Sequence, residues 1–196
     1  MLRVPSGINL KILCNIKKPP FWVAFSLFIL FLAAPHFGFY RLAEFRGGKS
    51  AQGKKVLDLG CGSGILGIGA RVLGCGYVCG CDIDPKAPDV ALSNAALNGI
   101  DGSDFKIYAG DILSDAGLRR ELGSEYDIVM ANIVSDVIIP LSAFAGSFMK
   151  RDGIFITSGI IEGRQDEVQA AIEKAGFEIV KHHCQEEWHC FECRLA

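Results

Sequence analysis

The segment 56–66, of sequence VLDLGCGSGIL, constrains the fold of this chain more than any other stretch. A short apolar strand is followed by glycines at alternate positions and then by the apolar start of a helix. Glycine lets the backbone approach a bound molecule closely and adopt conformations that a Cβ atom would forbid. The following helix directs its free N–H groups and the positive end of its dipole toward the turn. The segment therefore predicts a ligand-binding turn between a strand and a helix.

Asp58 discriminates between the ligands that such a turn can bind. A carboxylate beside the turn disfavours a pyrophosphate, because the two negative charges repel each other. It suits a ligand that carries an ammonium group as well as a carboxylate, such as the methionine moiety of S-adenosylmethionine. We therefore expect Asp58, Gly60, Gly62 and Gly64 to bind a cofactor of this kind.

From residue 54 onward, short apolar segments alternate with helical ones. The pattern predicts strands at 56–59, 77–82, 105–109, 126–131, 154–158, 177–184 and 188–194, and helices at 65–73, 86–97, 117–122, 138–150 and 165–174. Helices between short apolar strands indicate a mostly parallel sheet covered on both faces, and the last two strands close the sheet as a pair. The fold class is therefore α/β.

Polar residues follow three of these strands at the positions where ligands bind in open parallel sheets. We expect Asp82 to accept hydrogen bonds from a ribose diol, with Asp84 as its competitor or as a cap of the next helix. Asp111 is placed to accept from an adenine amine, with Ile112 packed on the ring. Asn132 is polar where an apolar strand emerges, although a turn asparagine is an equally good interpretation.

A nicotinamide-dependent oxidoreductase is the alternative. Gly62, Gly64 and Gly67 match the G-x-G-x-x-G fingerprint, and Asp82 lies twenty residues beyond Gly62. The register opposes this interpretation, because Gly60 rather than Gly62 closes the strand and Asp58 would face the pyrophosphate. An inactive cofactor-binding remnant is a third hypothesis.

Charge and hydropathy set residues 1–53 apart from residues 54–196. Residues 1–55 contain nine basic and one acidic residue, and the rest contains eleven basic and twenty-one acidic residues. The acidic part opposes direct nucleic-acid binding. The apolar stretch 21–40 contains a proline and a histidine and only just reaches the about 20 residues that span a bilayer. We expect either a membrane anchor or a segment produced by a shifted reading frame or wrong start.

The cysteines predict neither a disulfide framework nor a metal centre. Cys61, Cys75, Cys79 and Cys81 are expected to be small buried residues in a reducing compartment. The run 182–193 is rich in histidine and cysteine, but it contains no second Cys-x-x-Cys pair to complete a zinc site. We interpret it as alternating residues on two paired strands, and we expect no metal site.

The segments 56–65, 80–85, 94–99, 111–112, 131–133 and 158–160 together resemble class I S-adenosylmethionine-dependent methyltransferases. More narrowly, residues 54–196 resemble the PrmA family, which methylates large-subunit ribosomal protein eleven. The resemblance implies a Rossmann-like seven-stranded sheet, mostly parallel with a C-terminal antiparallel strand. It also implies cofactor contacts from Gly60, Gly62, Asp82 and Asn132, a ribosomal protein substrate and a cytoplasmic location.

The chain departs from the family pattern at two places. The family has an N-terminal recognition domain and a Phe-Gly-Thr-Gly-x-His loop, whereas this sequence has only Phe-Gly-Phe-Tyr at 37–40. We therefore expect an N-terminally truncated methyltransferase with little activity on the intact ribosomal protein. No residue is identifiable as a general base, so the catalytic residues stay unassigned.

Overall fold

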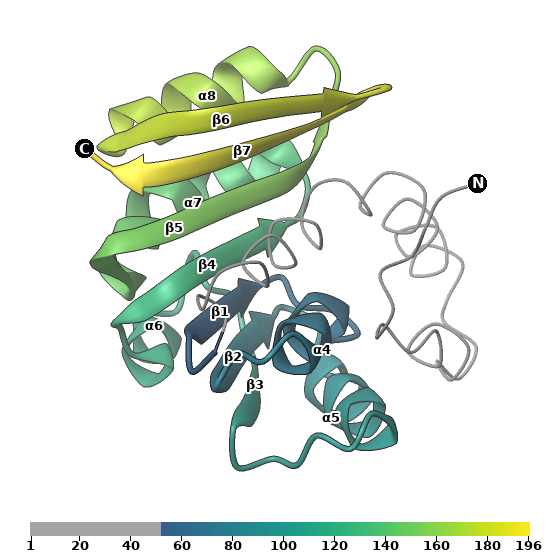
Figure 1. Cartoon of the computed structure of the whole chain (residues 1–196). Coiled ribbons are helices and arrows are strands. Elements are labelled where there is room, and N and C mark those ends of the chain that lie inside the picture. The colour runs from purple at the N-terminus through teal and green to yellow at the C-terminus, as the bar shows by residue number, and fades with distance from the viewer. Residues whose placement is uncertain (1–51) are drawn as a thin grey trace.

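A seven-stranded sheet with helices on both faces makes up the part of the chain that the computed structural model describes, residues 52–196 (Figure 1). The order of the strands is β3-β2-β1-β4-β5-β7-β6, and only β7 runs antiparallel to its neighbours. The strands are β1 (Lys55–Leu59), β2 (Tyr77–Asp82), β3 (Phe105–Ala109), β4 (Tyr126–Asn132), β5 (Met149–Ile161), β6 (Phe177–Gln185) and β7 (Trp188–Leu195). The predicted α/β sheet with one C-terminal antiparallel strand is confirmed.

Five helices connect these strands. They are α4 (Ile65–Val72), α5 (Ala87–Leu97), α6 (Ala116–Leu122), α7 (Ser135–Phe148) and α8 (Gln165–Lys174). The predicted apolar stretch 21–40, and with it the anchor or artefact interpretation, lies outside the described residues. Within residues 52–196, no helix has the length and apolar character needed to cross a membrane.

The sheet separates two apolar cores. Side chains from α6, α7 and α8 pack on one face, around Leu57 and Phe155, whereas α4 and α5 pack on the other, around Val56 and Phe105. Successive side chains of a strand point to opposite faces, so a strand that is buried on both faces is apolar along its whole length. This requirement explains the apolar run 128–131 in β4, whereas the buried Asp58 interrupts the apolar residues of β1.

The boundary between α7 and β5 differs from the prediction. The sequence pattern extends a helix over 138–150, but α7 begins at Ser135 and β5 begins at Met149. Met149 pairs with Tyr126 of β4, and its side chain is buried in the core of the α7 face. Pairing with β4 and burial override the local helix pattern, as tertiary context commonly does.

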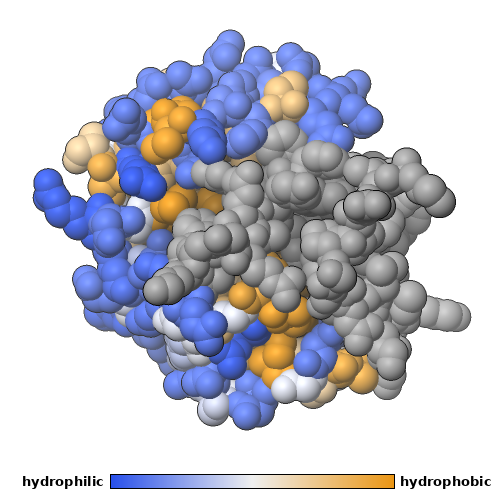
Figure 2. Space-filling view, viewed as in Figure 1, coloured by the Kyte–Doolittle hydropathy of each residue, from blue (hydrophilic) through white to orange (hydrophobic). Residues whose placement is uncertain are grey.

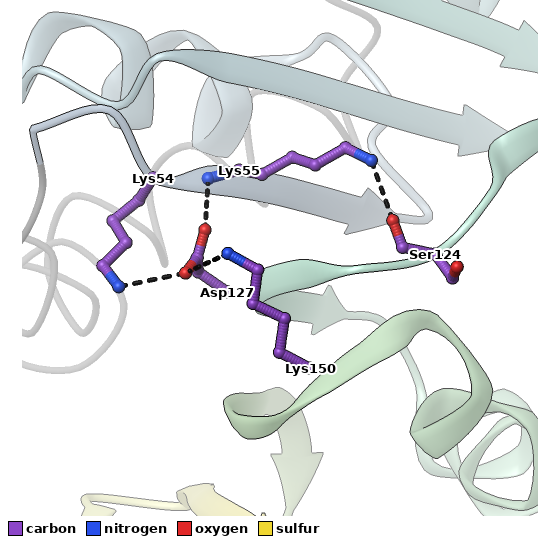
Figure 3. Close-up of polar contacts among 5 residues, drawn as sticks. All are labelled: Lys54, Lys55, Ser124, Asp127 and Lys150. Carbon is purple, nitrogen blue, oxygen red and sulfur yellow. Dashed lines mark hydrogen bonds and ion pairs between the residues drawn. The ribbon is translucent and has the colours of Figure 1, made fainter.

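An ion cluster fastens the amino ends of β1, β4 and β5 (Figure 3). Asp127 accepts hydrogen bonds from the Lys55 backbone N–H at 2.8 Å and from the ammonium groups of Lys54 at 3.0 Å and Lys150 at 2.9 Å. The Lys55 ammonium donates to the Ser124 carbonyl at 2.8 Å. Burial by itself would raise the pKa of Asp127, but these donors outweigh it and lower that pKa to about 2. The candidate site lies at the opposite, carboxyl ends of the strands.

Candidate functional site

The glycine turn is held against the end of β2 by backbone hydrogen bonds. The N–H groups of Gly60 and Cys61 both donate to the Cys81 carbonyl, at 2.9 and 3.0 Å. The Gly62 N–H donates to Oδ2 of Asp82 at 2.7 Å. The predicted turn residues and the predicted strand-end acid therefore meet in one hydrogen-bonded unit at the carboxyl edge of the sheet.

The backbone conformation explains why glycine is required in this turn. Gly60, Gly62 and Gly64 have φ values of +74°, +51° and +78°, which side chains rarely tolerate. A Cβ at residue 60 would collide with the Ile133 side chain, and one at residue 64 would lie 2.8 Å from the Ala91 Cβ. A Cβ at residue 62 would meet only Oδ2 of Asp82, 4.0 Å away. Open space therefore adjoins Gly62 on the side of Asp82.

Asp58 is buried and incompletely satisfied. Its Oδ2 accepts from the Gly67 N–H at 3.1 Å, whereas Oδ1 has no hydrogen-bond partner within the described part of the chain. Burial, together with the negative charge of Asp82, raises the pKa of Asp58 to about 7, although the Gly67 hydrogen bond opposes the shift. A buried carboxylate of this kind gains from a cationic donor, because leaving such a group unpaired is costly.

Asp82 and Asp84 have different surroundings. The Asp82 carboxylate binds the Gly62 N–H through Oδ2 and the Asp84 N–H through Oδ1, and the side chain is half-buried. Each oxygen keeps a lone pair for a further donor. Asp84 instead accepts from the Lys86 N–H just before α5, so its side chain caps the turn that leads into the helix. The assignment of Asp82 as the ligand contact stays a prediction.

Asp111 lies farther from the turn. The neighbouring residue Gly110 connects this segment to the end of β2, because its N–H donates to the Asp82 carbonyl at 2.8 Å. Its carboxylate accepts from the Leu113 N–H and the Ser114 hydroxyl, at 2.9 and 2.7 Å, and these bonds lower its pKa. The Ile112 side chain is buried in the core. The predicted adenine contact of Asp111 stays a prediction.

Asn132 ends β4 beside the glycine turn. Its backbone pairs with Ser158 of β5, and its side chain is half-buried. Within residues 52–196 no hydrogen bond involves the Asn132 side-chain amide, which leaves it available to a ligand. A Cβ at Gly159, where φ is +83°, would lie 3.0 Å from Oδ1 of Asn132. Gly159 therefore keeps the space next to this amide open.

Two further parts of this edge were not identified from the sequence as site residues. Ile133 fills the space behind Gly60, and Gly159 adjoins Asn132; the motif Ser-Gly-Ile at 158–160 is the signal that could have identified Gly159. Ile83, the first residue after β2, and Val134, the second after β4, are 72% and 62% exposed. Figure 2 shows apolar patches on an otherwise largely hydrophilic face of the molecule.

A family model described as ribosomal protein L11 methyltransferase (PrmA) matches residues 44–195. The chain belongs to this family. The expected resemblance to PrmA is therefore confirmed, and the match covers every strand and helix described above.

Two curated relatives named ribosomal protein L11 methyltransferase illustrate the relationship. The protein from Agathobacter rectalis is 43% identical over 134 residues, which cover 68% of this chain and 42% of the relative. The protein from Lachnospira eligens is 42% identical over 138 residues, which cover 69% of this chain and 43% of the relative. The chain thus spans less than half the length of these relatives.

Solved structures share the fold. The ribosomal protein L11 methylase from Lactobacillus delbrueckii subsp. bulgaricus superposes with a TM-score of 0.68 at 28% identity, covering 81% of this chain and 79% of the other. The magnesium protoporphyrin IX methyltransferase from Synechocystis, solved with bound S-adenosylhomocysteine (SAH), has a TM-score of 0.64 at 17% identity. It covers 81% of each chain, and at this identity the likeness concerns the fold alone.

Proposed function

We propose that this chain binds S-adenosylmethionine and transfers its methyl group to an amine of ribosomal protein L11 in the cytoplasm, with little activity by itself on intact L11. Membership of the PrmA family supports the reaction class, and the names of the relatives support the substrate. The observation that contributes most is the hydrogen bond between the Gly62 N–H and Asp82, since it joins the glycine turn to the acid expected to bind the ribose.

The residues at the carboxyl edge of the sheet fit this cofactor. Oδ1 of Asp58 is a buried acceptor, and a cationic amino-acid moiety supplies the type of donor that it lacks. The space beside Gly62 is open because no Cβ fills it. Asp82 retains lone pairs for the two hydroxyl groups of a ribose. A pyrophosphate would instead be placed near two carboxylates, which disfavours a nicotinamide dinucleotide.

Methyl transfer to an amine needs little covalent chemistry from the protein. The bound cofactor supplies a sulfonium methyl group; a C–N bond to the amine forms as the C–S bond breaks, leaving SAH. The side chains of this chain would therefore act mainly by holding the two reactants in line. Asn132, whose amide has no partner among the described residues, is suited to orient the acceptor amine.

The acceptor amine must be neutral when it attacks. A lysine amine has an ordinary pKa of about 10.4, so it must lose a proton through desolvation or to a nearby acceptor. No residue of the described site is identifiable as a general base, so we assign none. The released proton would then pass to solvent.

Calorimetric titration of the whole chain separates cofactor binding from catalysis. We expect saturable, one-to-one binding of SAH and no binding of NAD. Saturable NAD binding with no response to SAH would refute the cofactor assignment and support the oxidoreductase alternative.

A second assay tests the substrate. Purified ribosomal protein L11 is incubated with the chain and S-adenosylmethionine that carries a labelled methyl group, and mass spectrometry locates the label. Labelled L11 amines, formed far more slowly than by a full-length family member, would support the proposal. Binding of SAH with no labelled L11, alongside an active full-length family member as the positive control, would refute the substrate and leave the cofactor assignment intact.

A further inference from the structure

A group of metal-ligating side chains lies at the end of β5 and on the β6–β7 hairpin, within the described residues 52–196. Its members are Glu162, Cys184 and His189, whose ligand atoms all lie within 4.8 Å of one another. His189 is buried, whereas Cys184 and Glu162 are exposed. A buried nitrogen with two exposed ligands around it is an arrangement that an ion can enter from solvent.

The sheet register brings these residues together. Cys184 of β6 pairs directly with His189 of β7, and directly opposed residues of antiparallel strands project from the same face. His189 also pairs with Ile160 of β5, and Glu162 lies two residues farther along. The Glu162 N–H donates to the Glu187 carbonyl at 2.7 Å, which fixes the backbone of Glu162 against the hairpin. The paired strands β6 and β7 and the turn after β5 therefore contribute one ligand each.

The contacts converge on a single nitrogen atom. Nε2 of His189 lies 2.9 Å from Oε2 of Glu162 and 3.9 Å from Sγ of Cys184. In a nucleophilic triad, the nucleophile and the acid contact opposite nitrogens of the histidine ring. Here they contact the same nitrogen, so the arrangement resembles a ligand set around one point and not a Cys-His-Glu catalytic triad.

His182 holds the ring of His189 in place. Nε2 of His182 lies 2.8 Å from Nδ1 of His189, and the two rings stack with centroids 5.1 Å apart. The His182 ring also packs on Phe191, at 4.6 Å between centroids. When His189 keeps its proton on Nδ1 and donates it to His182, the lone pair of Nε2 is directed toward Cys184 and Glu162. Such an outer hydrogen bond is characteristic of metal-bound histidines.

We propose that Glu162, Cys184 and His189 form a binding site for Zn²⁺, with a fourth position open to water. Thiolate, imidazole and carboxylate are the three ligand types that zinc takes in proteins, and a thiolate with a carboxylate neutralises the dication. Tetrahedral zinc with ordinary bond lengths separates such ligands by about 3.4–3.6 Å. The observed distances from Nε2 of His189 are 2.9 Å to Oε2 of Glu162 and 3.9 Å to Sγ of Cys184. Rotations of these two exposed side chains suffice to change the distances to the values for zinc.

The positions of the three ligands explain why the sequence pattern did not predict this site. Cys190 and Cys193, which have a zinc-ligand spacing, belong to the two opposite cores of the sheet and cannot bind one ion together. Two of the proposed ligands lie in the run 182–193, but Glu162 lies far outside it. The ion would fasten the carboxyl end of β5 to the hairpin, close in the chain to Ser158 and Gly159 of the candidate cofactor site.

Metal titration of the whole chain, reduced and freed of metal with a chelator, tests the site. We expect one Zn²⁺ per chain, measured by competition with a chromophoric chelator. Co²⁺ as a probe should give a thiolate-to-cobalt charge-transfer band and the intense visible bands of tetrahedral cobalt. Binding of no metal at this stoichiometry would overturn the proposal.

Matched variants localise the ion. Cys184→Ser should abolish the charge-transfer band, and Glu162→Gln should preserve that band while weakening zinc binding at least tenfold. His182→Gln should weaken zinc binding about tenfold through loss of the outer hydrogen bond. Glu187→Gln serves as the control with unchanged affinity. Since Cys184 and Glu162 are exposed, their variants should retain the circular dichroism of the parent chain; undiminished zinc binding by both would overturn the proposal.

Discussion

Oδ2 of Asp82 accepts a hydrogen bond from the Gly62 backbone N–H at 2.7 Å. The bond connects the end of β2 to the middle of the glycine turn after β1. A change at Asp82 therefore alters both a proposed ligand contact and the shape of the turn, whereas a change at Asp84 alters only the entry to α5.

Asp82→Ala is expected to weaken SAH binding far more than Asp84→Ala. Loss of a partner to buried hydroxyl groups costs about 1–3 kcal/mol, which corresponds to roughly 5–150-fold in the dissociation constant. Isothermal titration of both variants measures the difference. Equal effects of the two substitutions would contradict the assignment of Asp82 to the ribose.

Gly60→Ala is expected to lower the free energy of unfolding more than Gly99→Ala. Both glycines have positive φ, +74° and +70°, so each substitution incurs a backbone cost of about 1–2 kcal/mol. Only at residue 60 does the added Cβ also collide with a neighbour, the Ile133 side chain. Urea denaturation of both variants gives the comparison, and Ile133→Ala in the Gly60→Ala background should recover part of the difference.

Asp127→Asn is expected to destabilise the chain at neutral pH and not at very low pH. The folded-state pKa of Asp127, about 2, lies below its ordinary value of 3.8, so ionised Asp127 stabilises the fold above pH 3.8. This contribution is lost as the pH falls through about 2. We expect a difference of about 1–2 kcal/mol at pH 7, since water screens the half-exposed lysines. Denaturation series at several pH values would show whether the wild type and variant converge in acid.

Asp58→Asn is expected to remove a pH dependence of opposite sign. The folded-state pKa of Asp58 is raised to about 7, so the folded chain retains a proton that the unfolded chain has already lost above pH 3.8. Stability of the wild type therefore falls as the pH rises from about 4 to 7, and this slope should flatten in the variant. Thermal unfolding across this window measures both slopes.

The same group gives SAH binding a pH dependence. If the ligand's ammonium group pairs with Asp58, affinity should increase as the pH rises through about 7 in the wild type, because the carboxylate forms. Asp58→Asn should bind more weakly and without that increase. An identical pH profile for both proteins would refute the contact between Asp58 and the ammonium group.

Much of the fold follows from local pattern. Strands β2 and β3 have the predicted bounds, because both are short, mainly apolar segments bounded by polar or glycine residues. The predicted start of β5, residue 154, was wrong. Met149 joins the strand because it pairs with Tyr126, a residue distant in sequence. The single antiparallel strand β7 was expected from the family resemblance, and the structure confirms it.

The site residues also fall into those that the sequence predicted and those that it did not. Gly60, Gly62 and Asp82 were predicted from a motif in which spacing and chemistry coincide, and the structure brings them into one hydrogen-bonded unit. Ile133 and Glu162 were not predicted, because each acquires its role from a neighbour on another strand. Their residue types are ordinary, so local sequence contains no signal for them.

The close approach of Gly60 to Ile133 makes the loops after β1 and β4 interdependent. A redesign that replaces one of these loops to accept a different small molecule must therefore replace the other as well. Libraries that randomise only the loop after β1 would lose stability wherever residue 60 gains a side chain, whereas joint randomisation would let residue 133 change with it.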